Sequence, residues 1–406
     1  MSQNLEQGKL PRSAWRWGFS CEFLLVQDIL DLKVPELMKE CNFGLFLKIY
    51  EHDFDTTYAK LLAKLKQLGI YDHFYPWPVL SLEDGYYPNI HTVDKFEALI
   101  NRIMAWYKKN KFQPPEYVLV DVEPDVDQER FKKNEELRKQ RAFIKLDARG
   151  KIIPIDPVKS NAEAQAEAKK AGKKQSPNII AEVGKIVDKI DEMDDARFDA
   201  MTKRFQRLVN AMHEQGTKAL CVALPITFSD LADGKNILQD FLTTPIQTVN
   251  WDMVNYMIFA EYTHAILEHD DFVHLVYSYC KDFAKQHGEK ASICFGVTGF
   301  GKHFDQIDPA LYLKEFNASL NAGVTQLGIF CLENILMLGE DKFKEFCTLL
   351  DTADGSFEPD PEKLEFAMLI RKMWEAVDAG VAPLLKQLVK SGRAMQLIQN
   401  FTKGGI

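Results

Sequence analysis

The sequence lacks long apolar runs. No stretch of its 406 residues approaches the roughly 18 uninterrupted apolar residues that a membrane-spanning helix needs. The first residues, MSQNLEQGKLPRSAWRWGF, also lack the apolar core of a secretion signal. We therefore expect a cytoplasmic protein without a membrane span. Apolar residues make up 46% and charged residues 27%, which argues against a disordered, collagen-like or coiled-coil chain.

Paired cysteines and the common catalytic motifs are also missing. The chain has seven cysteines, and no two of them form a CxxC pair. Several lie in apolar runs such as ALCVAL and SICFGV, so we expect reduced, buried thiols and no structural zinc site. There is no GxSxG elbow, no HExxH helix and no glycine-rich dinucleotide loop after the first apolar run. We expect no cofactor.

The sequence does contain a repeating order of short apolar runs and amphipathic stretches. The runs are nearly continuous, as in parallel strands that helices cover on both sides. Strand-helix units in this order predict an α/β fold, a (β/α)8 TIM barrel, with an open doubly wound sheet as the alternative. The predicted strands are 16–23, 43–51, 75–82, 117–123, 219–226, 251–259, 292–299 and 327–334. The predicted helices are 56–68, 93–110, 179–215, 263–287, 309–321 and 340–350.

Two regions depart from this repeat. Residues 124–178 form a basic insertion after the fourth strand: over 130–175, 14 Lys and Arg face 6 Asp and Glu, although the whole chain has a net charge of −9. Within it, IKLDARGKIIPI predicts a hairpin that turns at Asp147–Gly150. Residues 355–406 predict a helical C-terminal extension. The predicted domains are therefore 1–354, a barrel that includes the insertion, and 355–406, an extension packed on it.

These two regions are also where a partner is expected, if there is one. The insertion is basic but has no interleaved aromatic residues in its basic half, so we expect no nucleic acid. The final helical stretch is amphipathic, which suits packing on the barrel, a protein partner or a membrane surface. The favoured interpretation of the insertion is a solvated surface loop, and that of the final helical stretch is simple packing on the barrel.

Reactive side chains of a (β/α)8 barrel lie at the carboxyl ends of its strands and in the loops that follow. Acidic and aromatic residues gather at these positions here, whereas cations are scarce, with Lys48 and Lys302 the nearest. Carboxylates perform acid–base chemistry and aromatic rings stack on sugars, so this rim favours a carbohydrate ligand over a phosphate. The expected substrate-binding residues are Glu22, Asp53, Trp77, Glu83, Asp84, Tyr86, Met257, Phe259, Glu261 and Glu333.

The fourth strand carries the sharpest signal. Asp121 and Glu123 are two residues apart, so a strand places both on one face, pointing to the barrel axis near its open end. Two close carboxylates repel each other when both are ionised, and one of them then keeps its proton. A protonated acid beside an ionised partner is what the leaving oxygen of a glycoside requires. The alternative is that Asp121 is structural and Glu123 merely begins the loop.

VLVDVEP resembles the fourth strand of the family 18 glycoside hydrolases, the chitinases and related proteins, whose signature there is DxxDxDxE. Aligned on the last Glu, Asp121 and Glu123 match the final DxE, whereas Leu119 and Glu116 stand at the inner and first Asp. WDMVNYMIF is similar to that family's sixth strand, near DxxNxMxYD. The residues in register there are Asp252, Asn255 and Met257.

This resemblance implies a barrel in which Glu123 is the general acid and Asp121 its partner. In the family, the acetamido group of the substrate is the nucleophile, and a Tyr and an Asp help to hold it. Phe259 and Ala260 stand at those two positions here, and Cys331 stands where the eighth strand usually carries a Trp. These departures favour a competing prediction: a barrel that has lost catalysis and binds a carbohydrate or a protein.

Another clan of barrel glycosidases offers a second carbohydrate interpretation. Its acid lies in Asn-Glu-Pro at the end of strand 4, where this chain has Val122 in place of the Asn. Its nucleophile is a Glu at the end of strand 7, a strand that has no carboxylate here, so Glu333 or Glu261 would have to replace it.

A third class is a metal-dependent hydrolase, in which Asp53, Asp84 or Glu333 would lie close enough to Asp121 to share an ion. The favoured prediction remains a glycoside-hydrolase-like barrel that acts on a glycan or glycoside by general-acid catalysis.

Overall fold

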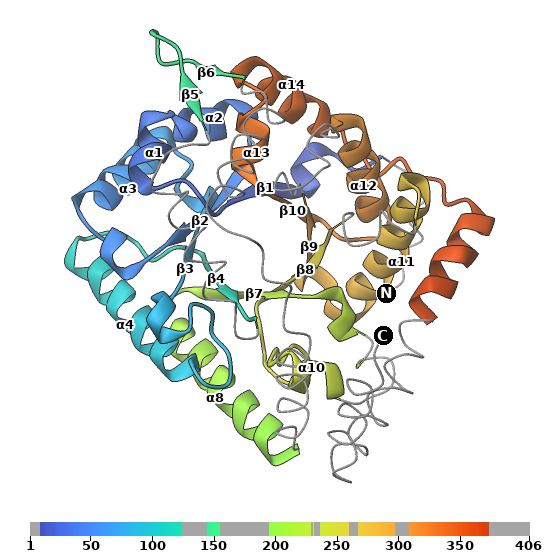
Figure 1. Cartoon of the computed structure of the whole chain (residues 1–406), viewed down its shortest axis with the longest axis horizontal. Coiled ribbons are helices and arrows are strands. Elements are labelled where there is room, and N and C mark those ends of the chain that lie inside the picture. Colours follow the sequence, from blue (N-terminus) through green and yellow to red (C-terminus); the bar gives the residue numbers. More distant parts are fainter. Residues whose placement is uncertain are drawn as a thin grey trace, which may run out of the picture.

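The computed structural model has a ring of strands at its centre and helices around it (Figure 1). It describes residues 9–123, 144–154, 195–228, 230, 236–259, 267–296 and 308–372. Within these ranges, no helix combines the length and the apolar composition that a membrane span requires.

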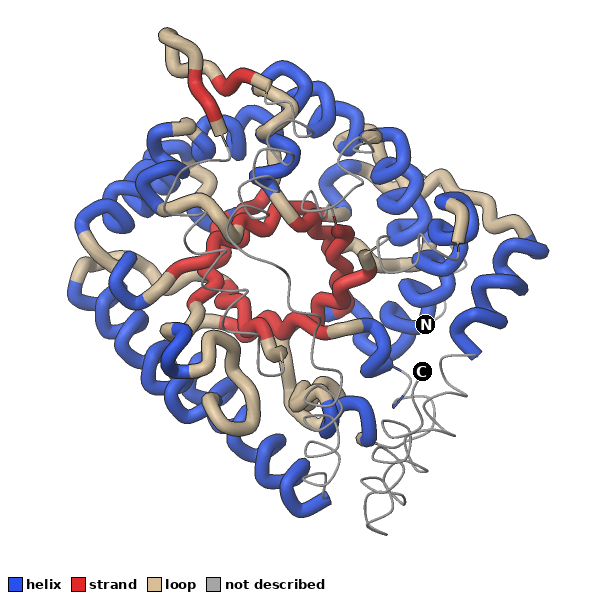
Figure 2. The backbone as a smooth tube through the Cα atoms, viewed as in Figure 1, coloured by secondary structure: helices blue, strands red, loops and turns tan. Residues whose placement is uncertain are grey.

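The ring is one sheet of eight parallel strands (Figure 2). They are β1 (Arg16–Cys21), β2 (Gly44–Ile49), β3 (Phe74–Pro78), β4 (Tyr117–Asp121), β7 (Lys218–Ala223), β8 (Met253–Ile258), β9 (Ala291–Gly296) and β10 (Gln326–Phe330). Their hydrogen-bonded order is β3-β2-β1-β10-β9-β8-β7-β4, and the two end strands also lie side by side. The nearly closed ring confirms the predicted (β/α)8 barrel.

Helices cover the outside of the ring on all sides (Figures 1 and 2). They are α1 (Val26–Asp31), α2 (Val34–Cys41), α3 (Thr56–Leu68), α4 (Val93–Lys109), α8 (Asp195–Glu214), α10 (Ile237–Phe241), α11 (His269–His287), α12 (Pro309–Asn321), α13 (Leu332–Leu336) and α14 (Glu340–Leu350). The helices predicted at 56–68, 309–321 and 340–350 have the predicted bounds.

Helix α3 shows how the local sequence sets these bounds. The carboxylate of Asp55 accepts the backbone N–H groups of Thr57 and Tyr58 and so caps the first turn. Gly69, with φ of 73°, ends the helix in the left-handed conformation that glycine tolerates best. The helix buries Leu61 and Leu65 against the ring, in the apolar layer that the longer outer helices share.

Side chains of each strand point alternately outward and inward, so the ring has one apolar layer outside it and another inside it. In β4, Val118 and Val120 pack outward in the layer between ring and helices, whereas Tyr117 and Leu119 belong to a distinct cluster inside the ring. Successive side chains of a strand point to opposite faces. Asp121 therefore follows Tyr117 and Leu119 into the interior.

The edge between β3 and β4, which we call the seam, is the one place where neighbouring strands of the ring are not joined by strand pairing. Pro76 and Pro78 explain it. Backbone N–H groups of alternate residues in a strand point to opposite edges of it. The N–H of Val79 donates to the carbonyl oxygen of Ile49 at the end of β2 (3.0 Å), so the N–H of Trp77, two residues earlier, also points toward β2. The two prolines therefore face the other edge of β3, toward β4, and have no N–H to donate there.

The loops and additions differ from the sequence expectations in places. The eighth strand was expected to run to residue 334, but it ends at Phe330, and Leu332 already begins α13. The predicted hairpin is confirmed, since β5 (Lys145–Leu146) and β6 (Ile152–Ile153) pair antiparallel around the turn at Asp147. The remainder of the insertion lies outside the described residues.

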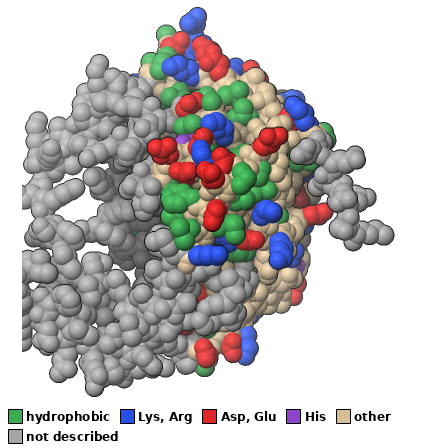
Figure 3. Space-filling model, turned by 90° about the vertical axis from the view of Figure 1, so that its right-hand side faces the viewer, with side chains coloured by type: hydrophobic (Ala, Val, Ile, Leu, Met, Phe, Trp, Pro, Cys, Tyr) green, Lys and Arg blue, Asp and Glu red, His purple; other side chains and the backbone are tan. Residues whose placement is uncertain are grey.

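The described part of the C-terminal extension includes a helical segment, 361–372, that packs on α11. Arg371 donates to the carbonyl oxygen of Ser278 (2.9 Å) and to Asp282 (2.6 Å), and the N–H of Asp360 donates to Nε2 of His274 (2.9 Å). Figure 3, which views the molecule from that side, shows acidic and basic side chains mixed with apolar ones. Residues 373–406 lie outside the described part of the chain.

Candidate functional site

A cavity of about 270 Å³ lies at the carboxyl end of the ring. Apart from Tyr87, which lies in the loop after β3, the lining residues belong to the strands or come just after them, and their side chains point into the ring. Six of the predicted site residues line it: Glu22, Trp77, Asp121, Glu123, Met257 and Phe259. The others that line it are Ser20, Phe46, Tyr87, Leu119, Val222, Leu224, Asn255, Cys294, Gly328 and Phe330.

Asp121 is the most deeply placed acid of the cavity, with 4% of its surface exposed. Burial raises the pKa of its carboxyl well above the ordinary value, and the nearby carboxylates of Glu123 and Glu22 raise it further. Its Oδ1 is buried and has no hydrogen-bond partner among the described residues. The neutral form of Asp121 is therefore favoured, and its Oδ1 is a polar atom that the described part of the protein does not satisfy.

Glu22, which follows β1 directly, also lines the cavity and lies beside a buried cation. The ammonium of Lys48, on β2, is 3.4 Å from Oε1 of Glu22 and donates to the hydroxyl of Tyr86 (2.8 Å). That hydroxyl in turn lies 3.5 Å from Glu22. Lys48 is only 1% exposed and also faces the ring of Tyr50, with Nζ 5.9 Å from its centre.

Aromatic side chains form much of the wall. Phe259 and Phe330 stack with ring centres 5.9 Å apart, and Phe259 packs so closely over Gly296 that a Cβ there would lie 2.5 Å from its ring. Trp77 lies between Pro76 and Pro78 on β3. Its indole N–H is buried and has no partner among the described residues.

The remaining predicted site residues lie elsewhere. Asp53 accepts the N–H of Tyr50 (2.8 Å), Glu83 is exposed, and Asp84 pairs with Lys95 (2.7 Å) on the surface. Tyr86 lies behind the cavity with Lys48 rather than lining it. None of these four lines the cavity, and Glu261 lies outside the described residues.

Glu333 is also away from the cavity surface, since it is fully buried at the start of α13. Its Oε1 accepts the backbone N–H groups of Phe23 (2.6 Å) and Leu24 (3.2 Å) and the thiol of Cys21 (3.1 Å). In this position Glu333 holds the loop that follows β1.

Sequence reasoning missed the aromatic residue of the last strand. The alignment places Cys331 at the position of the family's Trp, but Cys331 is fully buried and Phe330 lines the cavity. Because side chains alternate, an error of one residue in parity exchanges the inward and outward faces. The pairing of Gly328 with Gly18 on β1 fixes the parity, and the sequence alone does not show that pairing.

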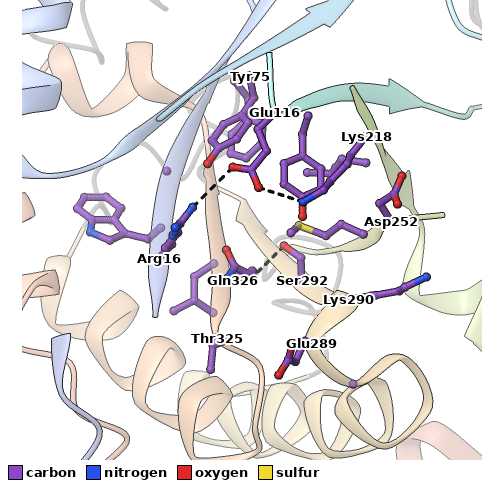
Figure 4. A pocket seen from close by; sticks show the side chains of 18 of the residues that line it. Arg16, Tyr75, Glu116, Lys218, Asp252, Glu289, Lys290, Ser292, Thr325 and Gln326 are labelled. Atoms are coloured by element: carbon purple, nitrogen blue, oxygen red, sulfur yellow. Dashed lines mark hydrogen bonds and ion pairs between the residues drawn. The ribbon is translucent and has the colours of Figure 1, made fainter. Parts of the chain in front are cut away.

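A second, wider cavity of about 810 Å³ lies at the amino end of the ring (Figure 4). Three of its charged groups lie together: Glu116 accepts from Lys218 (3.2 Å) and lies 4.0 Å from Arg16. Asp252 binds His213 (2.7 Å). Glu116 and Asp252, two of the residues aligned with the family 18 motifs, thus lie at the end of the barrel opposite to Glu123.

The metal interpretation needed other acids beside Asp121. Among the residues that the structure describes, no group of three or more His, Cys, Asp or Glu side chains is arranged to hold a metal ion. Asp53, Asp84 and Glu333 have the separate partners given above.

Comparisons with known proteins found similar solved structures but no sequence match. No protein-family model matches the chain, and no curated protein sequence matches it. Among solved structures, the PgaB (BpsB) glycoside hydrolase domain from Bordetella bronchiseptica is similar with a TM-score of 0.45 and 9% identity, over 85% of this chain and 99% of that one.

Two further solved structures are similar at comparable levels. A GH5 family lichenase from Caldicellulosiruptor sp. F32 has a TM-score of 0.41 and 12% identity, over 79% of this chain and 83% of its own. D-psicose 3-epimerase, solved in the presence of D-fructose, has a TM-score of 0.37 and 10% identity, over 89% of this chain and 99% of its own. The (β/α)8 assignment rests on the strand order of the chain itself.

Proposed function

We propose that this barrel hydrolyses a glycosidic bond in the cavity at its carboxyl end, with Glu123 as general acid. One observation carries the proposal. Asp121 and Glu123 line a single aromatic-walled cavity in which the Oδ1 of Asp121 and the indole N–H of Trp77 have no partner among the described residues. Buried polar groups are normally satisfied, so such a donor and acceptor suit the hydroxyl groups of a sugar.

The two acids of β4 divide the proton chemistry. Asp121 is the more buried of the pair, and its raised pKa favours keeping a proton in the site. Coupled carboxyls titrate as a pair, so the proton that Asp121 stores is available to Glu123. Glu123 lies farther out along the strand and delivers the proton to the leaving oxygen. The resemblance of VLVDVEP to the family 18 signature supports the same roles.

The size of the cavity points to small substrates. Ligand pockets usually enclose roughly 300–1,000 Å³, and this one encloses about 270 Å³. We therefore expect a single sugar ring to occupy it, stacked against the aromatic wall that Phe259 and Phe330 form.

The test is turnover of a panel of aryl glycosides as a function of pH. Replacing the proton donor, Glu123→Gln, should lower kcat/KM by about 10²–10⁴-fold and remove the basic limb of a bell-shaped pH profile. The matched control is Glu116→Gln, the same exchange at the other end of the same strand, which should leave the profile unchanged. Turnover by Glu123→Gln equal to that of the wild type would refute the assignment.

A second candidate is a barrel that binds a carbohydrate without cleaving it. It is favoured by Phe259, which supplies no hydroxyl at the position where the resembling family has a Tyr. No turnover of any glycoside by the wild type, together with quenching of tryptophan fluorescence by sugars that Trp77→Phe abolishes, would establish this alternative.

A further inference from the structure

The cavity has a second carboxylate whose surroundings differ from those of the β4 pair. Glu22 extends from β1, and β1 and β4 are separated in the ring by β2 and β3. In a ring of eight strands this separation puts the two side chains on facing sides of the cavity that both of them line. A sugar ring in the cavity would therefore lie between Glu22 and Glu123.

The electrostatic environment differs between the two sides. Lys48 lies 3.4 Å from Glu22, and the Tyr86 hydroxyl lies within 3.5 Å, so both favour the charged form of Glu22. For Asp121, burial and the neighbouring carboxylates of Glu123 and Glu22 favour the neutral form. One side thus favours a charged carboxylate and the other a protonated one, which is the division of roles that separate acid and base residues need.

We propose that Glu22 is the second catalytic carboxylate of the glycosidase chemistry, acting on the face of the sugar opposite to Glu123, and that Lys48 and Tyr86 are its positioning residues. This inference rests on the proposed function. It differs from a mechanism in which the substrate's own acetamido group is the nucleophile, because the attacking or activating oxygen belongs to the protein. It therefore predicts activity on sugars that have no acetamido group.

The reaction balances in either of two forms. Glu123 gives its proton to the glycosidic oxygen as the C1–O bond breaks, and the electron pair of that bond leaves with the alcohol. In the first form, Glu22 bonds to C1, and water later displaces it while returning a proton to Glu123. In the second form, Glu22 takes a proton from the water that attacks C1. The first retains the anomeric configuration and the second inverts it, so proton NMR of the fresh product distinguishes them.

The experiment measures the turnover of aryl glucosides without an acetamido group by wild type, Glu22→Gln, Glu22→Ala and the control Glu116→Gln. We expect Glu22→Gln to lower kcat by about 10²–10⁴-fold with little change in KM. Added azide or formate should restore turnover by Glu22→Ala at least tenfold, because a small anion can occupy the space of the lost carboxylate. Thermal melting of each variant checks that it is folded.

The positioning residues have their own readout. Tyr86→Phe removes a donor to the Glu22 carboxylate, which makes its charged form less favourable. The acidic limb of the kcat/KM profile should therefore move to higher pH, whereas a merely structural loss would lower the whole profile without moving it.

The outcomes separate the two proposals. If Glu123→Gln is inactive while Glu22→Gln keeps wild-type kcat, or if no anion rescues Glu22→Ala, the role of Glu22 is overturned and the proposed function stands. If the wild type turns over no glycoside, both are overturned.

Discussion

At the scale of single residues, Glu333 is a buried carboxylate committed to the backbone. We expect Glu333→Ala to lower the free energy of unfolding by about 3 kcal/mol, because it leaves the N–H groups of Phe23 and Leu24 without an acceptor. Glu333→Gln keeps an oxygen at that place and should lose less than about 1.5 kcal/mol. Urea unfolding measures both. Equal losses would contradict the hydrogen-bonding role.

His287 makes stability depend on pH. Burial, and then the charge of Lys290, lower its pKa from 6.5 to about 4, while its Nε2 meets the Tyr256 hydroxyl (2.8 Å). The unfolded chain binds this proton below pH 6.5 and the folded chain only near pH 4, so stability is full above 6.5 and falls as pH is lowered toward 4. The difference between the two pKa values corresponds to about 3.4 kcal/mol of folding stability, at about 1.36 kcal/mol per pKa unit. Because His287 is partly exposed and solvent screens its charge, we expect a loss of about 2 kcal/mol.

The check compares wild type with His287→Gln by urea unfolding at several pH values. The variant should lose less stability between pH 7 and pH 4 than the wild type does, by that difference of about 2 kcal/mol. Parallel pH dependences of the two proteins would show that His287 does not titrate in this way.

At the scale of elements, glycine permits the close approach of β1 and β2. A Cβ on Gly18 would lie 2.6 Å from the carbonyl oxygen of Gly44, whereas one on Gly328, its register partner on β10, would meet nothing closer than 3.4 Å. We expect Gly18→Ala to destabilise the barrel by about 1–3 kcal/mol and Gly328→Ala by less than about 1 kcal/mol. Thermal melting of the two variants tests this, and the reverse order would show that the strands shift apart without cost.

The strands and the longer helices could be predicted because each contains enough residues to show its hydrophobic pattern. Continuous apolar runs marked all eight strands, and the period of Thr56–Leu68 marked α3. Helices α1, α10 and α13 have five or six residues each, too few to show a helical period, and none of them was predicted. The eighth strand was drawn too long because the apolar letters of 327–334 continue past Phe330 into α13.

Strand-end positions placed six of the predicted residues at the cavity, but which side chains contact one another was predictable only within one strand. Asp121 and Glu123 share a strand, and their spacing alone puts them on one face. The pairing of Glu22 with Lys48 and Tyr86 joins three different strands or their loops, and nothing local in the sequence specifies it. The backbone role of Glu333 likewise depends on a loop more than 300 residues away, Phe23 and Leu24.

At the scale of the whole molecule, the ring keeps two chemically different ends apart. The amino end carries charges that neutralise one another, such as Glu116 with Lys218 (Figure 4). The carboxyl end carries acids that repel one another, and one of them, Glu22, lies close to the cation of Lys48. The apolar cluster inside the ring, which includes Leu119 and Val222, separates the two.

The seam between β3 and β4 gives the cavity an adjustable wall. Trp77 stands on one side of it and Asp121 on the other, and Pro76 and Pro78 leave that edge of β3 short of N–H donors. The two strands can therefore part by a small distance without giving up a ladder of hydrogen bonds. A ligand wider than the resting cavity would be admitted at this edge before any other part of the ring had to yield.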